Sequence, residues 1–285
     1  KITFFEILTA AYFYRAKNFK QNINIIESGL FHRFDATNIV SNNLASIVTS
    51  IGLDHLDWLP KNEQNIKKII FEKTSSLLNS KIIIAKQSSK EKAKLIKKTI
   101  SNNKSKKIIF DENFSYSINE NNFIYYEDEF GKLKLPKPNL LGNFQVDNAA
   151  SAIATARSLK LGIADEQIKL GITKAKSIAR LQEIKKGKLK KMCLANKIYI
   201  DGSHNPLGAA VLNKYFEKLN CNVHIILGMM SNKDHKEYIS FFRNISSLTT
   251  IDIPNQPNAI SGRNLKEKLN HISNVKYEKS VFEAI

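Results

Sequence analysis

Short runs of β-branched residues alternate along this chain with longer segments whose apolar residues recur at helical spacing. A helical segment over residues 62–78 precedes the run Lys81–Ala85, and another begins near Lys236, after the run Val223–Leu227. Because strands that alternate with helices form parallel sheets joined by crossovers, the pattern predicts an α/β fold with parallel sheets.

The same patterns predict the other elements and two domains. We expect helices over 3–17, 142–160, 165–174 and 207–219, strands over 23–26, 44–51 and 198–200, and an antiparallel insertion of short strands between 106 and 135. A polar, lysine-rich stretch over 174–191 separates the halves. We therefore expect one domain over 1–176 and a smaller, Rossmann-like α/β domain over 177–285. No cap is evident before the apolar segment 4–14, so we expect the chain to be a fragment.

Composition narrows the class of protein. The 285 residues carry 44 Lys and Arg against 26 Asp and Glu, but only six of the basic residues are Arg and the lysines are spread along the chain. Nucleic-acid binding favours clustered Arg with aromatic residues, so we expect no nucleic-acid partner. No segment approaches the roughly 20 apolar residues that span a bilayer, and no signal peptide is evident, which predicts a cytoplasmic protein with no membrane partner. Cys193 and Cys221 have no metal-ligand spacing and are expected to be reduced.

The segment 201–208, Asp-Gly-Ser-His-Asn-Pro-Leu-Gly, follows the apolar run 197–200 directly and precedes a helical segment. Ligands of α/β proteins bind at the carboxyl ends of strands, and the start of a helix carries a partial positive charge. Asp201 and His204 are thus placed where an anionic ligand such as a nucleotide phosphate would bind. A common Asp-Gly turn followed by a helix start is the structural alternative.

Glu27 and His55 each follow a predicted strand, so a parallel sheet would bring them together although 28 positions separate them. A carboxylate and an imidazole with open remaining positions suit a divalent ion that also binds phosphate oxygens. On the residues alone, a surface carboxylate and a satisfied polar histidine remain the alternative, and Lys73 would be an ordinary solvated lysine.

Several segments resemble one family in the same order along the chain. They are 27–38 (Glu-Ser-Gly-Leu-Phe-His-Arg-Phe-Asp-Ala-Thr-Asn), 50–55 (Ser-Ile-Gly-Leu-Asp-His), 71–76, 142–150, 177–182, 201–208 and 227–234. Together they resemble the folylpolyglutamate synthase and dihydrofolate synthase family, a branch of the ATP-dependent Mur ligases. The resemblance covers nearly the whole chain and implies a Mur-ligase-like ATPase domain followed by a smaller ligase domain.

The resemblance implies a role for individual residues. Magnesium that bridges the ATP phosphates would be held by the matching Glu27 and His55, and by Lys73 if its amine is carbamylated. The substrate side would be lined by Arg33 and Asp35. The remaining matches concern ATP: Asn148 against the adenine, Arg180 at the hinge reaching the phosphates, and Asp201 and His204 from the second domain. Lys73, Arg180 and His204 are the predicted catalytic residues.

The chain also departs from the family pattern. Phe31-His32 replaces two glycines, which would let a backbone approach a ligand closely. Phe144 replaces a histidine, Ala179 a glycine, and Thr74-Ser75-Ser76 replaces Ala-Gly-Ile. The phosphate-cradling pattern Gly-x-x-x-x-Gly-Lys-Ser/Thr does not occur between residues 1 and 285.

The resemblance therefore predicts an ATP-dependent ligase, acting as a cytoplasmic monomer, that adds L-glutamate to dihydropteroate or a folate with ATP and Mg²⁺. The substitutions leave two alternatives open. One is a Mur-type ligase for another carboxylate. The other is a degenerate nucleotide-binding relative without catalytic activity, which would be favoured if the native polypeptide begins near Lys1.

Overall fold

The computed structural model describes residues 1–40, 42–78, 80–195 and 197–285. Backbone packing divides the chain into two compact units. Unit 1 comprises residues 1–117, 126–133 and 150–163, and unit 2 comprises 118–125, 134–149 and 164–285. The domain boundary expected near Lys176 stays a prediction.

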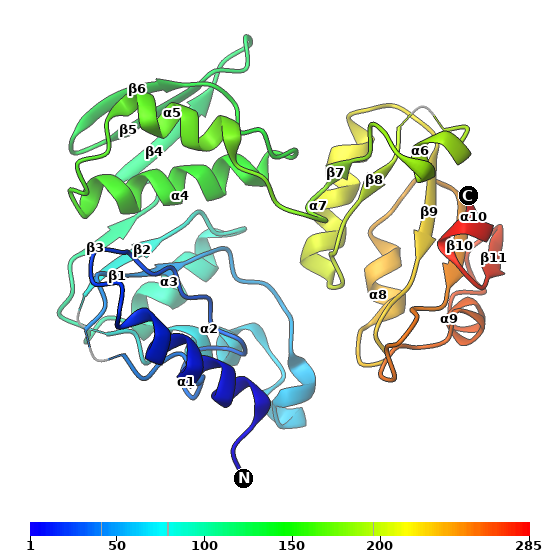
Figure 1. Cartoon of the computed structure of the whole chain (residues 1–285), viewed down its shortest axis with the longest axis horizontal. Helices are drawn as coiled ribbons and strands as arrows, with labels where there is room; N and C mark the ends of the chain where they lie inside the picture. Colours follow the sequence, from blue (N-terminus) through cyan, green and yellow to red (C-terminus); the bar gives the residue numbers. More distant parts are fainter. Residues whose placement is uncertain (41, 79, 196) are drawn as a thin grey trace. The chain divides into compact units, whose positions relative to one another are not determined.

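Unit 1 is built on a parallel sheet in the order β1 (Ala45–Val48), β2 (Lys81–Ile84), β3 (Lys107–Ile109), which confirms the predicted α/β class. Helices α2 (Ile66–Thr74) and α3 (Lys90–Thr99) cover one face of this sheet (Figure 1). The core between them contains fully buried isoleucines from both layers, namely Ile69, Ile70, Ile82, Ile84 and Ile96. The alternate residue Ile83 faces the other side of the sheet, as strand geometry requires, and is also buried.

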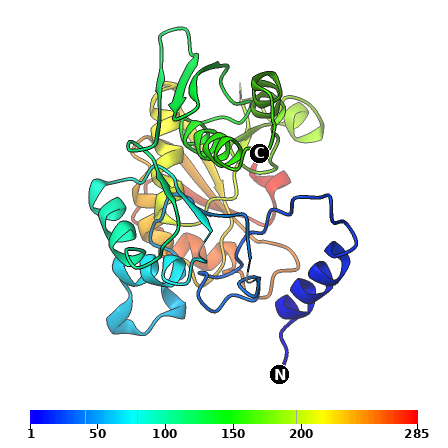
Figure 2. The ribbon, with the colours of Figure 1, turned by 90° about the vertical axis from the view of Figure 1, so that its left-hand side faces the viewer.

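Helix α1 (Phe4–Ala16) confirms the helix expected over 3–17, but the expectation that no cap precedes it was wrong. The hydroxyl of Thr3 accepts a hydrogen bond from the backbone N–H of Glu6, whose carboxylate accepts one from the backbone N–H of Thr3, so the two form a capping box. Most apolar side chains of α1 are exposed, and Figure 2 shows this helix apart from the β1–β3 sheet of its own unit.

The strand expected over 23–26 is absent, and the helix expected over 62–78 is shorter. Ile25 is 90% exposed and its segment is irregular, because a β-branched run needs a neighbouring strand to pair with. Two short 3₁₀ turns, η1 (Leu56–Trp58) and η2 (Lys61–Glu63), come before α2. Helix α2 itself begins after Asn65, whose side chain accepts from the N–H of Lys68.

The short strands expected between 106 and 135 form β4 (Phe114–Ile118), β5 (Ile124–Asp128) and β6 (Gly131–Leu135), a sheet in that order. Helices α4 (Phe144–Ser158) and α5 (Asp165–Lys174) follow and confirm the predicted helices. A buried ion pair joins β5 to α4, since Arg157 Nε lies 2.9 Å from Asp128 Oδ2.

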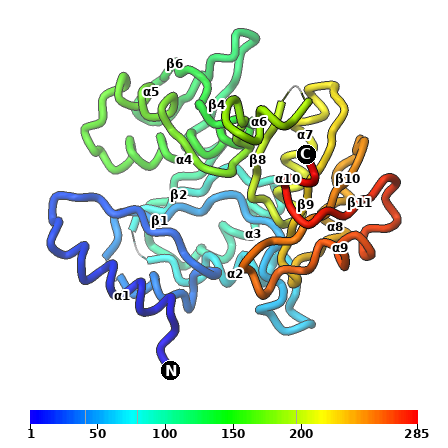
Figure 3. Tube along the Cα trace, turned by 45° about the vertical axis from the view of Figure 1, so that its right-hand side comes forward, coloured from blue at the N-terminus to red at the C-terminus, as the bar shows by residue number. Residues whose placement is uncertain are grey.

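Unit 2 contains the second α/β sheet, in which parallel strands run in the order β11-β10-β9 (Figure 3). From residue 182 onward, the strands and helices of unit 2 are β7 (Gln182–Glu183), α6 (Lys188–Met192), β8 (Tyr199–Ile200), α7 (Pro206–Glu217), β9 (Val223–Leu227), α8 (His235–Ser240), β10 (Ile245–Ile251), α9 (Gly262–Lys268), β11 (Val275–Glu278) and α10 (Val281–Ala284). Leu248 of β10 packs with Ile239 of α8 and Leu265 of α9, and all three are fully buried. No helix among the described residues is both long and apolar enough to cross a membrane.

Candidate functional site

Lys73 lies in the last turn of α2, among residues that the sequence expects to act together. Burial lowers the pKa of the Lys73 amine, and the carboxylates of Asp54 and Glu27 act on it in the opposite direction. The backbone N–H of His55 donates to Asp54 Oδ1 at 2.9 Å, and His55 Nε2 lies 3.8 Å from Asp54 Oδ2. We call Glu27, Asp54, His55 and Lys73 the Lys73 cluster. The structure thus places Glu27 and Asp54 within electrostatic reach of Lys73, and His55 contacts Asp54.

Phe31 contacts two members of the Lys73 cluster. Its ring centroid is 6.0 Å from that of His55 in an edge-on arrangement, and Lys73 Nζ is 5.8 Å from the Phe31 centroid. Phe31 has a φ of 55°, a left-handed conformation that bulky residues seldom adopt, and it packs against the core of unit 1. The phenyl ring therefore puts apolar surface beside His55 and Lys73, where a pair of glycines would leave space.

The donor types of the Lys73 cluster fit magnesium. Mg²⁺ is usually held by one or two carboxylates together with substrate phosphates and water. Among the residues that the structure describes, no group of three or more His, Cys, Asp or Glu side chains could hold a metal ion. The pair expected from the sequence, Glu27 and His55, is smaller than such a group, and its binding of magnesium stays a prediction. Carbamylation of Lys73 stays a prediction.

Arg33, expected on the substrate side, is held by Glu72 of α2. Arg33 Nε and Nη2 each donate to one carboxylate oxygen of Glu72 at 2.8 Å, and the backbone N–H of Arg33 donates to the backbone oxygen of Glu72 at 3.0 Å. The Glu72 side chain is only 8% exposed, and Lys68 Nζ lies 3.3 Å from it. Burial raises the pKa of Glu72, but the hydrogen bonds from Arg33 and Lys68 outweigh burial and hold that pKa below its usual value.

The loop 27–38 is folded onto itself by Asp35 and His32. Asp35 Oδ2 accepts from the backbone N–H of Leu30 at 2.8 Å and Oδ1 from that of Thr37 at 3.0 Å. Burial raises the pKa of Asp35, yet the hydrogen bond from the Thr37 hydroxyl and those from the backbone N–H groups outweigh burial and lower that pKa. His32 Nδ1 lies 3.1 Å from Ser28 Oγ, its Nε2 is buried without a hydrogen-bond partner in the described chain, and burial lowers the pKa of His32. The contacts of Arg33 and Asp35 are thus internal, and their contact with substrate stays a prediction.

Arg180 lies in a sharply bent segment, residues 179–182, which we call the arginine arch. Strands β7 and β8 pair antiparallel with Gln182 opposite Ile200, a register that brings Leu181 opposite Asp201. The backbone N–H of Leu181 donates to Asp201 Oδ2 at 2.6 Å. The arch therefore joins Arg180 and Asp201, two predicted site residues that are 21 positions apart in the sequence.

His204 and Asn205 stand at the start of α7. His204 Nδ1 lies 3.0 Å from the backbone oxygen of Gly202, which orients an otherwise exposed ring. Asn205 is the N-cap of α7, and its side chain accepts from the N–H of Gly208 at 2.9 Å, with Pro206 at the first helical position. The predicted strand, turn and helix start are thus confirmed, and His204 lies beside a helix N-terminus that favours negative charge.

Asn148 lies in the first part of α4. Its amide nitrogen donates to Gln145 Oε1 at 3.1 Å, and Gln145 is buried. Phe144 occupies the position where the family has histidine, and its ring packs against Gly142, where a Cβ would come within 2.3 Å of it. The contact of Asn148 with adenine stays a prediction.

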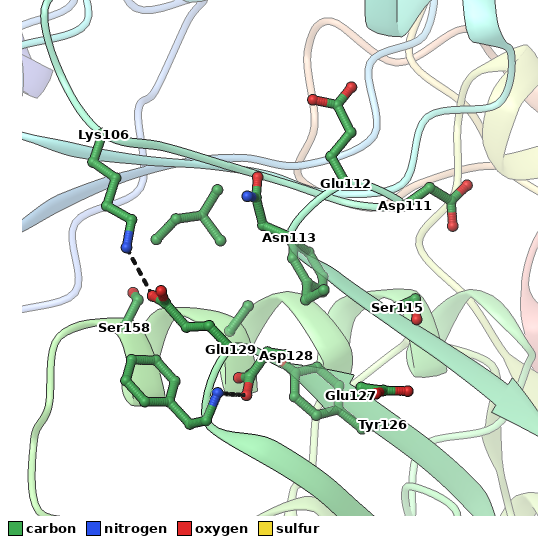
Figure 4. A pocket seen from close by; sticks show the side chains of 14 residues that line it. Lys106, Asp111, Glu112, Asn113, Ser115, Tyr126, Glu127, Asp128, Glu129 and Ser158 are labelled. Atoms are coloured by element: carbon green, nitrogen blue, oxygen red, sulfur yellow. Dashed lines mark hydrogen bonds and ion pairs between the residues drawn. The ribbon is translucent and has the colours of Figure 1, made fainter.

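A cavity of about 370 Å³ in unit 1 is lined by residues of β3, β4, β5 and α4, none of which is among the predicted site residues (Figure 4). Lys106 and Glu129 form an ion pair of 2.8 Å at this cavity, and Asp128 is held by Arg157 and by the hydroxyl of Tyr126. Most carboxylates that line this cavity are thus paired with a cation or accept a hydrogen bond.

The sequence motifs do not predict two features of this site. One is the role of Glu72, and the other is the position of Phe31 next to Lys73. Glu72 follows Lys68 by four positions, a helical spacing that predicts a local ion pair, but nothing in the sequence shows that it binds Arg33 across 39 positions. The sequence marks Phe31 only as a departure from the family's glycine pair. Its contact with His55 depends on two separate loops meeting.

Comparison with known proteins decides the family. Residues 3–156, which are more than half of the chain, match the model of the Mur ligase middle domain. The chain belongs to the Mur ligase family. The resemblance drawn from the sequence motifs is thereby confirmed for the part of the chain that carries Glu27, His55, Lys73 and Asn148.

Relatives within this family extend the similarity into unit 2. The chain is 27% identical over 256 residues to the dihydrofolate synthase/folylpolyglutamate synthase of Escherichia coli, a match that covers 86% of this chain and 54% of that protein. It is also 27% identical over 265 residues to the Bacillus subtilis enzyme of the same name, covering 86% of this chain and 56% of the relative. The chain thus spans about half the length of the curated relatives it matches.

Solved structures give the same result for the fold. The structure of Escherichia coli FolC in complex with ADP matches all of this chain and 64% of its own, with a TM-score of 0.83 and 26% identity. The predicted succession of a Mur-ligase-like part and a Rossmann-like part is thus confirmed as an architecture.

Proposed function

We propose that this chain belongs to an ATP-dependent ligase that joins L-glutamate to the carboxylate of dihydropteroate, of a folate, or of both. The observation that carries the proposal is the Lys73 cluster. The carboxylates of Asp54 and Glu27 act on the half-buried Lys73, and the imidazole of His55 lies 3.8 Å from Asp54 Oδ2, in a chain whose relatives are named dihydrofolate synthase/folylpolyglutamate synthase. These contacts support, for unit 1, the site that the family motifs predict.

ATP is needed because a carboxylate does not react with an amine at neutral pH. In the proposed reaction a carboxylate oxygen of the acceptor attacks the γ-phosphorus, the bond to the β-phosphate oxygen breaks, and an acyl phosphate and ADP form. The glutamate nitrogen then attacks the acyl carbon and loses a proton, and phosphate leaves with one oxygen of the original carboxylate. Magnesium held by Glu27 and His55 would supply charge neutralisation at the phosphates.

The residues of this chain would act by position and charge. Arg180 is exposed on the arginine arch, and a guanidinium is suited to the negative charge of a transferring phosphoryl group. His204 lies beside the N-terminus of α7, which favours the same charge. We propose that Asn148 contacts the adenine, and that Arg33 and Asp35 shape the acceptor side through the loop they stabilise.

The test is a ligation assay on protein expressed from its complete reading frame. MgATP and glutamate are supplied with either dihydropteroate or a reduced folate, and products are followed by mass. Gain of one glutamyl unit is the expected result, and the acceptor that works separates the synthase from the polyglutamate activity. No glutamyl product with either acceptor, from folded protein, would overturn the proposal and favour another carboxylate substrate or a non-catalytic relative.

We also propose that the protein works as a monomer in the cytoplasm. Light scattering coupled to size exclusion measures the first property, and fractionation of the native cells measures the second. A stable dimer, or recovery with the membrane fraction, would overturn the respective part.

A further inference from the structure

The backbone holds Phe31 in place on both sides. The N–H of Leu30 donates to Asp35 Oδ2 at 2.8 Å, and the N–H of Arg33 donates to the backbone oxygen of Glu72 at 3.0 Å. Phe31 itself has a φ of 55°, and a bulky residue keeps this left-handed conformation only where its surroundings impose it. The loop 27–38 therefore sets the direction in which the phenyl ring leaves the backbone.

The phenyl ring contacts both the core of unit 1 and the Lys73 cluster. It is half-buried and packs against that core, and its centroid lies 6.0 Å from that of the His55 ring and 5.8 Å from Lys73 Nζ. A phenyl ring offers no hydrogen-bond donor, whereas a glycine pair leaves room for a ligand to approach the backbone N–H groups. Phe31 therefore gives this side of the Lys73 cluster an apolar surface.

Two cations near this loop are already paired. Arg33 donates to both carboxylate oxygens of Glu72, and Lys68 lies 2.7 Å from Glu63 and 3.3 Å from Glu72. A further carboxylate brought to the loop would compete with Glu72 for Arg33 and would be repelled by the carboxylate of Asp35. A carboxylate that loses water without gaining a partner is strongly disfavoured.

The two acceptors of the proposed reaction present different carboxylates. In dihydropteroate the carboxylate is bonded directly to a flat benzene ring, and the molecule has no other carboxylate. A folate presents the side-chain carboxylate of a glutamyl group, which is flexible and carries a second carboxylate on its α-carbon. The first acceptor thus brings an aromatic surface next to the reacting group, and the second brings an additional negative charge.

We propose that Phe31 determines acceptor specificity: it favours a carboxylate bonded directly to an aromatic ring, as in dihydropteroate, over the glutamyl carboxylate of a folate. The benzene ring of the acceptor packs against the phenyl ring, as aromatic pairs do, whereas a glutamyl group brings its second carboxylate to an apolar surface. This inference rests on the proposed function, in which the acceptor carboxylate meets the γ-phosphate of ATP beside the Lys73 cluster.

Competition between acceptors in the complete protein is the first arm of the test. Wild type receives MgATP, glutamate and equal concentrations of dihydropteroate and tetrahydrofolate, and the initial rates of the two glutamyl products are followed by mass. Their ratio gives the ratio of kcat/KM, and we expect dihydropteroate to be preferred about tenfold or more. Equal use of both acceptors, or preference for tetrahydrofolate, would overturn the inference and leave the proposed function standing. No product from either acceptor would overturn both.

The second arm compares two phenylalanines of the same loop. Phe31→Gly removes the ring, and glycine suits a φ of 55°, so the preference for dihydropteroate should fall about tenfold. Phe34→Ala is the matched control, because Phe34 is 84% exposed and its ring centroid lies 4.3 Å from Cζ of the paired Arg33. The preference of this variant should stay within about twofold of wild type. An unchanged preference in Phe31→Gly, or an equal fall in Phe34→Ala, would overturn the inference.

Phe31→Leu provides a milder variant in case Phe31→Gly fails to fold. It keeps an apolar side chain against the core of unit 1 but removes the flat ring. The preference for dihydropteroate should therefore fall by about threefold, the size of one aromatic contact. A preference equal to that of wild type would contradict packing of the acceptor against the phenyl ring.

Discussion

The Lys73 cluster and the arginine arch are organised by different interactions. Around the Lys73 cluster, the loop 27–38 is anchored to α2 by an ion pair between two side chains, Arg33 and Glu72, 39 positions apart. The arginine arch is anchored by a carboxylate that accepts from backbone amides across a two-stranded ladder. The first anchor depends on the charge of both partners. The second depends on one acceptor and on strand register, so the two regions should respond differently to mutation.

Removal of the first anchor should have the largest effect on stability. Glu72→Ala leaves Arg33 without its carboxylate in a largely buried place, and loss of one partner of a buried pair costs about 3 kcal/mol or more. Thermal or urea unfolding measures the change. Glu63→Gln is the control, because Glu63 pairs with the same Lys68 but is 41% exposed, and we expect at most about 1 kcal/mol from it. Equal effects of the two variants would contradict the assigned role of Glu72.

The same anchor should weaken in acid. The pKa of Glu72 is held below its ordinary value of 4.5 in the folded protein, so its contribution to stability is fully present above that value and is lost as the pH falls through the folded pKa. Urea unfolding of wild type and Glu72→Gln at a series of pH values measures this. The difference between the two proteins should be largest near neutral pH and should shrink below pH 4.5. A difference that stays constant into strong acid would show that charge is not what anchors the loop.

The smallest expected effect concerns the backbone of the arch. Ala179 has a positive φ where the family pattern has glycine, so Ala179→Gly should relieve strain and raise the free energy of unfolding by up to about 1 kcal/mol. Ala175→Gly is the control, since Ala175 has a φ of −56° and glycine there should destabilise by about 0.5–1 kcal/mol. A loss of stability in Ala179→Gly would show that the left-handed conformation is not a cost at this position.

The two regions also differ in how far the sequence predicts them. Asp201, Asn205 and Pro206 follow a strand and begin a helix, and these local signals predict their places correctly. The hydrogen bond between Asp201 and the arch was not predicted, because strand register between residues 182 and 200 depends on tertiary packing.

The Lys73 cluster shows which contacts the sequence does not predict. Glu27 was expected at the end of a strand that does not form. It still lies within electrostatic reach of Lys73, and the ion pair between Arg33 and Glu72 anchors its loop, residues 27–38, to α2. Arg33 matches a family motif, but its partner Glu72 carries no motif signal. Local patterns therefore predict which residues flank the strands and helices, and they do not predict the long-range ion pairs that join loops to helices.

Transfer of an oxygen atom tests the proposed chemistry most directly. The acceptor is prepared with ¹⁸O in its carboxylate and incubated with the complete protein, MgATP and glutamate, and the phosphate released is analysed by mass. If an acyl phosphate forms, each glutamyl product should be accompanied by one phosphate carrying a single ¹⁸O atom. Glutamyl product accompanied by unlabelled phosphate would contradict the acyl phosphate, and phosphate release without glutamyl product would contradict the ligase.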